Sequence, residues 1–429
     1  MKRKSIITTC VLIISACNLT GQTFYGEIRQ RGEYRYGYKV PADSSSDYAV
    51  FVSQRTRLGV SFDLKNVQTK ITIQDVRVWG NQKLKSSDAT TGIYEAWVLL
   101  PLTDSLSLKL GRQELIYDNE RILSNNNWNQ AGQVHDAAVV KYRHNGLKVD
   151  WGLSYNSQEE SLFGNDYSES FKGGKLEGNY KSMSFIHLEK MLTKKFKLSI
   201  TSVGDAFQKE NTSNTNYVRG TFGGSAIWET PFSTFLSLHG YYQTGKTPDA
   251  LKINAWYLNP EANVKLNKLS LNPGAEIFSG NNKNTGAEGK HYAFSSLYGT
   301  GHNYNGHMDY FTDIPKHTKN AGLIDIYLKN SFKLTDKASL KLDYHYFKLQ
   351  NEYVYHEELK TTVYSYSYLG SEIDFNCNIE FSKEVGLLFG YSVFIPEEPL
   401  NYILGGDSGK LSQWGFVMLT VKPNFKLSK

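Results

Sequence analysis

The first charged side chains beyond the N-terminal segment alternate with uncharged ones, in a spacing that could bind anions. In GEIRQRGEYR (26–35) every charged residue has an odd number. The pattern continues in QRTRLGVSF (54–62), so the set comprises Glu27, Arg29, Arg31, Glu33, Arg35, Arg55 and Arg57. A guanidinium group stays charged at any relevant pH and binds carboxylate or phosphate through two parallel hydrogen bonds. In a narrow, partly desolvated channel, such a cluster would attract anions and repel cations.

Acidic residues offset part of this charge. Glu27, Glu33 and Asp63 share the faces of these five arginines, which leaves an excess of two positive charges. Two interpretations therefore stay open. The arginines line an anion path, or they form a nearly neutral charge ladder that satisfies and stiffens a polar interior.

Strands with one apolar and one polar face must position these side chains. LKVDWGLSYN (147–156) alternates large apolar residues with Lys, Asp, Gly, Ser and Asn, and LGSEIDFNCNIEF (369–381) follows the same rule. Alternation with a period of two indicates a half-buried strand. We count about eighteen such segments, and sixteen is the alternative count. In ITIQDVRVWG (71–80) the apolar phase slips, which predicts a bulge or a strand end, and the faces of 109–115 also stay open.

The links between these segments alternate in length. Short links such as 102–105 and 144–146 are interleaved with long ones such as 116–133 and 278–320. Bacterial outer-membrane barrels have short periplasmic turns and long extracellular loops. The fold we expect is all-β: a single transmembrane antiparallel β-barrel with its charged face inside. A secreted β-sandwich or propeller is the alternative, but no blade-like period is found.

The N-terminus resembles a secretory signal. Three basic residues (2–4) precede an apolar stretch (5–16), and we expect residues 1–21 to be removed, leaving 22–429 as the barrel domain. Residues 14–17 also resemble a lipobox, which leaves open a lipidated Cys17. Removal of the three basic residues lowers the formal net charge from +6 to +3, which does not suggest a nucleic-acid partner.

The longest connection, 278–320, is too aromatic in its second half for a solvated loop. Its candidate constriction residues are Tyr298, His302, Tyr304, His307, Asp309 and Tyr310. Loops of this length inside ordered proteins are usually functional, so we expect it to fold into the pore as a constriction. Aromatic packing on the barrel rim is the alternative.

Several motifs in this order resemble the alginate export porin family. They are RGEYR (31–35), QRTRLGVSF (54–62), QDVRVWG (74–80), LGRQEL (110–115), LYGTGHNYNGHMDYF (297–311) and GLIDIYL (322–328). The resemblance implies an eighteen-stranded outer-membrane barrel with an arginine-rich constriction that passes a polyuronate. It also places Arg55, Arg57, Arg77 and Arg112, which sit in the matching motifs, in the lumen.

One departure from that family concerns gating. Its exporter uses a long, late periplasmic turn as a plug, whereas 334–337 and 381–384 are brief here. A general diffusion channel therefore stays as open as polysaccharide export.

Rival functions need other residues. A barrel enzyme would need a facing nucleophile or base, for which His135–Asp136, His239 and Asp343–His345 are the weak candidates. A surface receptor would bind through its loops without conducting.

We expect a channel for hydrophilic, most readily anionic, solutes in the outer membrane of a Gram-negative bacterium. We expect no catalytic residues, metal or cofactor. The expected partners are outer-membrane lipid, small anions or acidic polysaccharide, and the barrel-assembly machinery. Solute, direction, gating and oligomeric state stay open.

Overall fold

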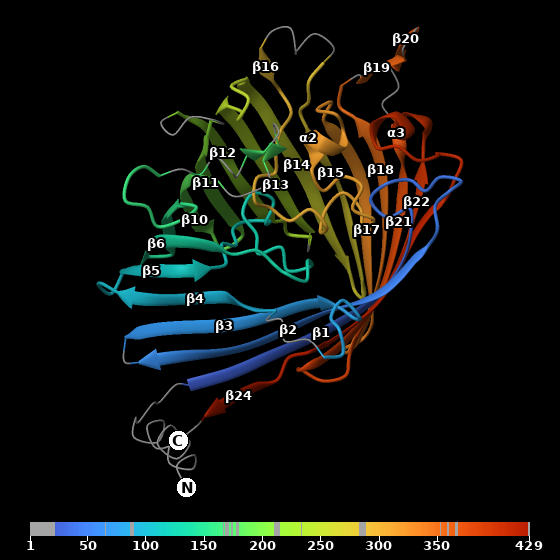
Figure 1. The fold of residues 1–429 in the computed structure, drawn as a ribbon. Coiled ribbons are helices and arrows are strands. Elements are labelled where there is room, and N and C mark those ends of the chain that lie inside the picture. The colour runs from blue at the N-terminus through green and yellow to red at the C-terminus, as the bar shows by residue number, and fades with distance from the viewer. Residues whose placement is uncertain are drawn as a thin grey trace.

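Eighteen long strands pair in chain order into a ring in the computed structural model (Figure 1). The structure describes residues 22–427 apart from 65, 86–89, 166, 168–170, 173–174, 177–179, 210–214, 233, 283–288, 352, 358–359 and 365–367. The expected signal segment, 1–21, lies outside the described residues. None of the described helices is long and apolar enough to cross a membrane.

The ring strands, in order, are β1 (Gln22–Tyr36), β2 (Ala49–Leu64), β3 (Val67–Val78), β4 (Thr91–Pro101), β5 (Leu106–Gln113), β6 (His135–His144), β7 (Leu147–Tyr155), β10 (Ser182–Thr193), β11 (Phe196–Gln208), β12 (Asn216–Glu229), β13 (Thr234–Lys246), β14 (Lys252–Leu266), β15 (Leu269–Phe278), β17 (Leu323–Thr335), β18 (Ala338–Leu349), β21 (Tyr368–Glu380), β22 (Val385–Pro396) and β23 (Ser412–Val421). Short elements lie in the links: β8 (Phe171–Lys172), β9 (Lys175–Leu176), β16 (Lys290–His291), α2 (Ile314–His317), β19 (Tyr353–Glu357), β20 (Lys360–Tyr364), α3 (Glu398–Ile403) and β24 (Asn424–Leu427).

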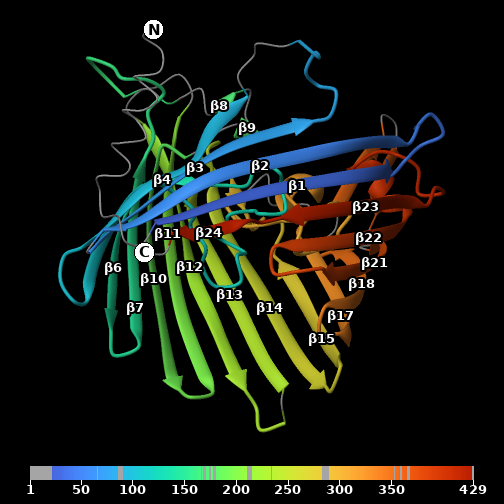
Figure 2. The ribbon, with the colours of Figure 1, turned by 90° about the horizontal axis from the view of Figure 1, so that it is seen from below.

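The ring closes between its first and last long strands. β1 pairs antiparallel with β2 on one side and with β23 on the other, from Ile28 opposite Val421 to Tyr36 opposite Gln413. Figure 2 shows β1 lying between these two strands. Closure leaves the ring without an unpaired edge, which is the condition for a sheet to be stable in lipid.

Burial along the strands is inverted relative to a water-soluble protein. In β7, Trp151 and Leu153 are each 46 % exposed on the outside of the ring, whereas Asp150 and Ser154 are 3 % and 6 % exposed on the inside. An apolar outer band and a polar interior are the pattern of a transmembrane barrel. The predicted fold class, strand count and alternation of short and long links are confirmed. The phase slip in 71–80 corresponds to a register shift between Thr72 and Ile73 in the β3–β4 pair.

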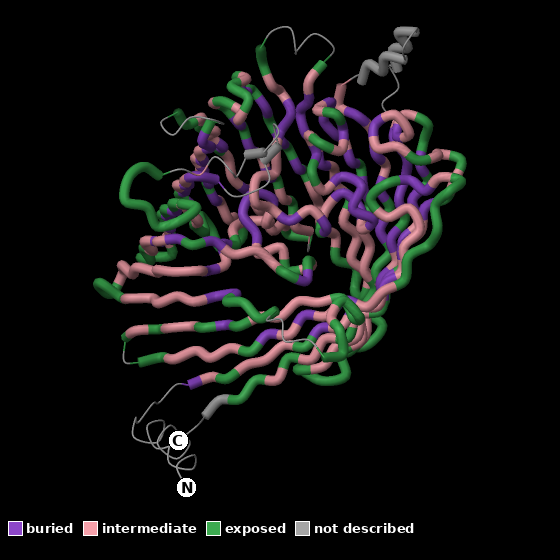
Figure 3. The backbone as a smooth tube through the Cα atoms, viewed as in Figure 1, coloured by how far each residue is buried: buried purple, intermediate pink, exposed green. Residues whose placement is uncertain are grey.

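Two of the long links fold into the ring. The 114–134 segment joins β5 to β6, and the 279–322 segment joins β15 to β17. They meet at an isolated bridge between Leu123 and Tyr298, and their apolar side chains, such as Phe294 and Phe311, are fully buried. Figure 3 shows buried residues gathered where these segments meet the strands. The core of this barrel is therefore built from inward loops packed on the inner wall.

Candidate functional site

Arg29 of β1 fixes the 114–134 segment to the barrel wall. Its guanidinium donates to the main-chain carbonyls of residues 127, 128 and 129, at 2.7, 3.1 and 3.0 Å. Its Nε donates to the side-chain oxygen of Gln130 at 2.9 Å. These bonds use the donors that an anion would otherwise take, so Arg29 holds a loop.

Arg55 and Arg57 of β2 extend this anchor. Arg55, directly opposite Arg29 in the β1–β2 register, is fully buried, pairs with Glu27 and donates to Asn127. Arg57 lies over the Tyr94 ring, 3.4 Å from its centroid, and donates to the carbonyl of residue 131 and to Gln74. Arg29, Arg55 and Arg57 lie on neighbouring strands, and all three donate to the segment that crosses the lumen.

A second anchor joins both inward segments to the opposite wall. Arg121 is 1 % exposed and pairs with the fully buried Glu276 of β15 at 2.8 Å. Arg121 also donates to the carbonyl of Thr300 at 3.2 Å and to Asn305. A buried ion pair with this many additional hydrogen bonds is costly to break, which fixes the two segments relative to each other.

The predicted constriction residues of the 279–322 segment divide into anchors and lining groups. The tyrosines are anchors: Tyr298 donates to Asp205 at 2.7 Å, Tyr310 donates to the carbonyl of Gly37 at 2.6 Å, and Tyr304 bonds to the carbonyl of Asn119. The other three residues, His302, His307 and Asp309, line cavities in the lumen.

An outer basic cavity of about 690 Å³ lies toward the long-loop end of β1–β3. Its charged lining residues are Arg31, Glu33, Arg35, Lys39, Arg77 and Asp309, an excess of two positive charges. Glu33 accepts from both Arg31 and Arg35, and Arg77 pairs with Asp75 behind it. The side chains of Arg35, Lys39 and Arg77 are 30 %, 53 % and 35 % exposed, so solutes can reach them.

An inner basic cavity of about 570 Å³ lies toward the short-turn end of β17, β18 and β21. Its lining includes Lys329, Lys341 and Asp343, an excess of one positive charge, together with His302, His307 and His345. The buried acids behind it are engaged: Asp325 accepts from His345, and Glu372 and Asp374 accept the main-chain N–H groups of residues 308 and 307.

Two pKa shifts mark the loop groups of these cavities. Burial lowers the pKa of the His307 imidazole to about 4, against the opposing effect of Asp374. Burial raises the pKa of the Asp309 carboxyl, but His302 and the Tyr38 hydroxyl outweigh burial, so this pKa lies below its usual range. Near neutral pH, His307 is therefore uncharged and Asp309 is ionised.

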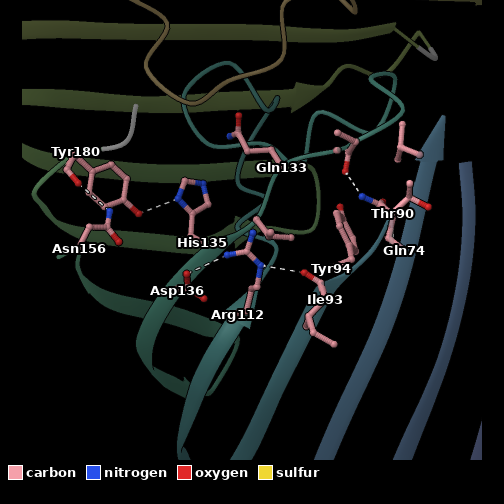
Figure 4. Close-up of a pocket in the computed structure, with 15 residues that line it drawn as sticks. Gln74, Thr90, Ile93, Tyr94, Arg112, Gln133, His135, Asp136, Asn156 and Tyr180 are labelled. Atoms are coloured by element: carbon pink, nitrogen blue, oxygen red, sulfur yellow. Dashed lines mark hydrogen bonds and ion pairs between the residues drawn. The ribbon is translucent and has the colours of Figure 1, made fainter. Parts of the chain in front are cut away.

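An outer balanced cavity of about 440 Å³ is lined by the long-loop ends of β3–β6 (Figure 4). Its charged residues are Arg112 and Asp136, which pair at 3.0 Å. Beside them, His135 Nδ1 lies 2.9 Å from the Tyr180 hydroxyl, which donates to Ser154 at 3.1 Å. With the Tyr180 hydrogen on Ser154, His135 must carry its own hydrogen on Nδ1.

An inner balanced cavity of about 470 Å³ lies below it, toward the short turns of β3–β10. Its lining holds five basic residues (Lys70, Lys109, Lys141, Arg143 and Lys148) and five acidic ones (Glu95, Glu114, Asp118, Asp150 and Glu189). Many of these are paired across neighbouring strands, as in Lys70–Glu95, Lys141–Asp150 and Lys148–Glu189. The cavity therefore carries no net formal charge.

The residues predicted from the sequence therefore divide into those that line a cavity and those that lie beneath a loop. Arg31, Glu33, Arg35 and Arg77 line the outer basic cavity, and Arg112 lines the outer balanced one. Glu27, Arg29, Arg55 and Arg57 lie under the 114–134 segment and line none of the four cavities.

Four further residues line a basic cavity and were not predicted from the sequence: Trp128, Lys39, Lys329 and Lys341. A lone tryptophan within the polar run NNNWNQ (125–130) is the signal that could have drawn attention to Trp128. The lysines carry no such signal, because lysines are spread throughout the chain.

Comparison with solved structures shows that outer-membrane barrels share this fold. OccAB4 of Acinetobacter baumannii is 11 % identical with a TM-score of 0.62, and the match covers 95 % of this chain and 99 % of that chain. OccK9 (OpdG) of Pseudomonas aeruginosa is 11 % identical with a TM-score of 0.61, covering 94 % and 98 %. OpdK of the same organism, solved with vanillate, is 9 % identical with a TM-score of 0.59, covering 94 % and 99 %.

The search of curated proteins found no match. The family model described as alginate export matches residues 21–401, which is most of the chain. Together with the closed ring, its apolar outer band and its polar lumen, this match identifies a channel that contacts lipid in the Gram-negative outer membrane. The chain belongs to the alginate export family.

Proposed function

We propose that the channel passes small anionic solutes passively along the two basic cavities, which we name the basic route. The observation that carries the proposal is that the lining of this route has an excess of positive charge on both sides of the inward loops. Fixed charge of one sign in a low-dielectric lumen raises the local concentration of ions of the opposite sign.

The cations on this route are available to a solute. Among the described residues, Lys341 forms no ion pair, and it is exposed on the inner face of β18. Lys329 lies over the Tyr327 ring, 4.4 Å from its centroid, which leaves its ammonium group able to bind an anion. By contrast, Arg29 and Arg55 are committed to loop carbonyls and to Glu27.

The family description and one similar structure support an acidic solute. The family model carries the description alginate export, and the OpdK structure was solved with vanillate. The two basic cavities are separate in this structure, so we propose solutes of the size of a single sugar acid or aromatic acid. Assembly into the membrane by the barrel-assembly machinery is part of the same proposal.

An enzymatic role is not proposed. Ser225 and His239 lie 2.5 Å apart, but both are buried in the wall and neither lines any of the four cavities. His345 is held by Asp325 rather than by Asp343. A nucleophile without access to substrate cannot act on it.

Single-channel recording in planar bilayers tests the proposal. Under a KCl gradient, the wild-type reversal potential should indicate anion preference. In R35Q/R77Q and in K329Q/K341Q the anion-to-cation permeability ratio should fall roughly two- to fivefold. The control K148Q, which changes a lysine paired with Glu189, should leave the ratio near that of the wild type. Cation preference in the wild type would refute the proposal, and a chain that never conducts would favour a receptor.

A further inference from the structure

Two aromatic rings separate the outer basic cavity from the inner one. Trp128 and His302 are the residues that line both cavities. Their rings stack with centroids 4.0 Å apart and planes inclined by 8°. These two side chains, one from each inward segment, therefore form part of the wall across the basic route, and they are the lining residues that the two cavities share.

His302 is the fixed half of this stack. Its Nδ1–H donates to Asp309 at 2.8 Å, and Asp309 also accepts from the Tyr38 hydroxyl. The His307 ring stacks against His302 with centroids 5.2 Å apart. Because both sides of the imidazole are occupied and its donor is used, His302 cannot leave its place without breaking several contacts.

Trp128 is fixed through its main chain but not through its ring. Its carbonyl accepts from Arg29 and from Arg31, each at 3.1 Å. Trp128 is half-buried, and its indole N–H donates to no partner among the described residues, so no side-chain hydrogen bond fixes the ring. The ring is held by the Arg31 guanidinium, 4.4 Å from the centroid, and by the edges of Trp414 and Phe416.

We propose that the Trp128–His302 stack is the selectivity-determining constriction of the basic route, and that Trp128 is its moving half. A change of the Trp128 side-chain torsions swings the indole away from His302 and joins the two cavities. The main-chain bonds to Arg29 and Arg31 hold the loop during this movement. The size of the opened gap sets the largest anion that passes.

This inference rests on the proposed function for its route, and the test separates the two. Conductance in 1 M KCl and the reversal potential under a gradient are measured on the same purified channels. W128A should raise conductance at least about threefold by removing the barrier. W128L, which keeps apolar packing, and H302A should give smaller increases in the same direction.

A matched tryptophan provides the control. Trp97 also lies beneath a cation, with Lys109 at 4.1 Å from its ring centroid, but it lines only the inner balanced cavity. W97A enlarges a cavity without joining the two basic ones, so its conductance should stay near that of the wild type. Heat-modifiability on gels confirms that each variant is folded, and W128L replaces W128A if the latter is not.

Each outcome is decisive. Increased conductance in W128A and W128L, with W97A unchanged, supports the constriction. This conclusion holds even if the reversal potential shows no anion preference, a result that would refute only the proposed solute class. Unchanged conductance in folded W128L, or an equal increase in W97A, overturns the constriction while leaving the anion preference to be judged separately.

Discussion

The basic route and the balanced cavities share one lumen but use their charges differently. On the balanced side, basic and acidic residues face each other across neighbouring strands, as Lys141 faces Asp150 and Lys148 faces Glu189. On the basic side, Glu33 is shared by two arginines and Lys341 forms no ion pair within the described chain. The difference indicates that strand register, more than composition, determines which charged side chains in the lumen lack an ion-pair partner.

The two sides also differ in what closes them. Between the balanced cavities, the Tyr94 hydroxyl donates to Glu114 at 2.7 Å, so a directional hydrogen bond spans the gap. On the basic route, the barrier is a stack of rings. Stacking contributes about 0.5–1.5 kcal/mol beyond burial, and movement of Trp128 must also break its contacts with Arg31, Trp414 and Phe416.

The largest effect should come from removing the anchor that both sides depend on. R29Q leaves the carbonyls of residues 127–129 without their charged donor, which should destabilise the 114–134 segment by about 2–4 kcal/mol. Hydrogen exchange at these amides should accelerate, and the single-channel current should become noisy. R112Q is the control, because the Arg112–Asp136 pair is well exposed and contributes little. Equal hydrogen-exchange rates in R29Q and the wild type would show that Arg29 does not anchor the 114–134 segment.

Acid should loosen the 279–322 segment on the basic side through His307. The pKa of His307 is about 4 in the folded loop and 6.5 ordinarily, so its charged form is disfavoured by folding. Loop stability should be full above pH 6.5 and fall by roughly 1–3 kcal/mol as the pH drops toward 4. Current noise recorded between pH 7 and pH 4 measures the change.

The groups around His307 define the control for this pH effect. His302, His345, Lys329 and Asp374 act on it electrostatically, and Asn376 lies within hydrogen-bond distance. H307Q cannot be protonated and should weaken the response above pH 4. The lowered pKa of Asp309 acts below that window, since ordinary aspartates titrate near 3.8. An unchanged response in H307Q would assign the effect to other groups.

The smallest effect should come from removing one carboxylate on each side. D343N in the inner basic cavity should raise the anion-to-cation permeability ratio about twofold. E114Q in the inner balanced cavity should change it by less than about 1.3-fold, because most current bypasses that side. A larger shift in E114Q than in D343N would reverse the assignment of the conducting route.

The strands and their faces could be predicted because lipid imposes a simple rule on them. Each residue of 147–156 either meets lipid or the lumen, so alternation alone gave the faces of Trp151 and Asp150 correctly. The pairing of β1 with β2 followed from chain order, and it brought Arg29 opposite Arg55.

The division of the arginines into anchors and lining groups could not be predicted in this way. It depends on where the 114–134 segment places its carbonyls, and loop conformation has no period that a sequence pattern can reveal. Trp128 was missed for the same reason: its role arises from meeting His302, which is 174 positions away in the chain. Only the packing of the two inward segments shows that contact.

The pairing between β1 and β23 determines when the barrel can close during its biogenesis. β1 pairs with β23, which is far from it in the chain. The ring therefore cannot close until β23 has also been exported. β1 also carries Arg29, which clasps the 114–134 segment. A chain truncated before residue 412 would therefore lack the strand that pairs with β1. Its 114–134 segment would also be held less firmly. Periplasmic proteases can then distinguish it from the closed channel.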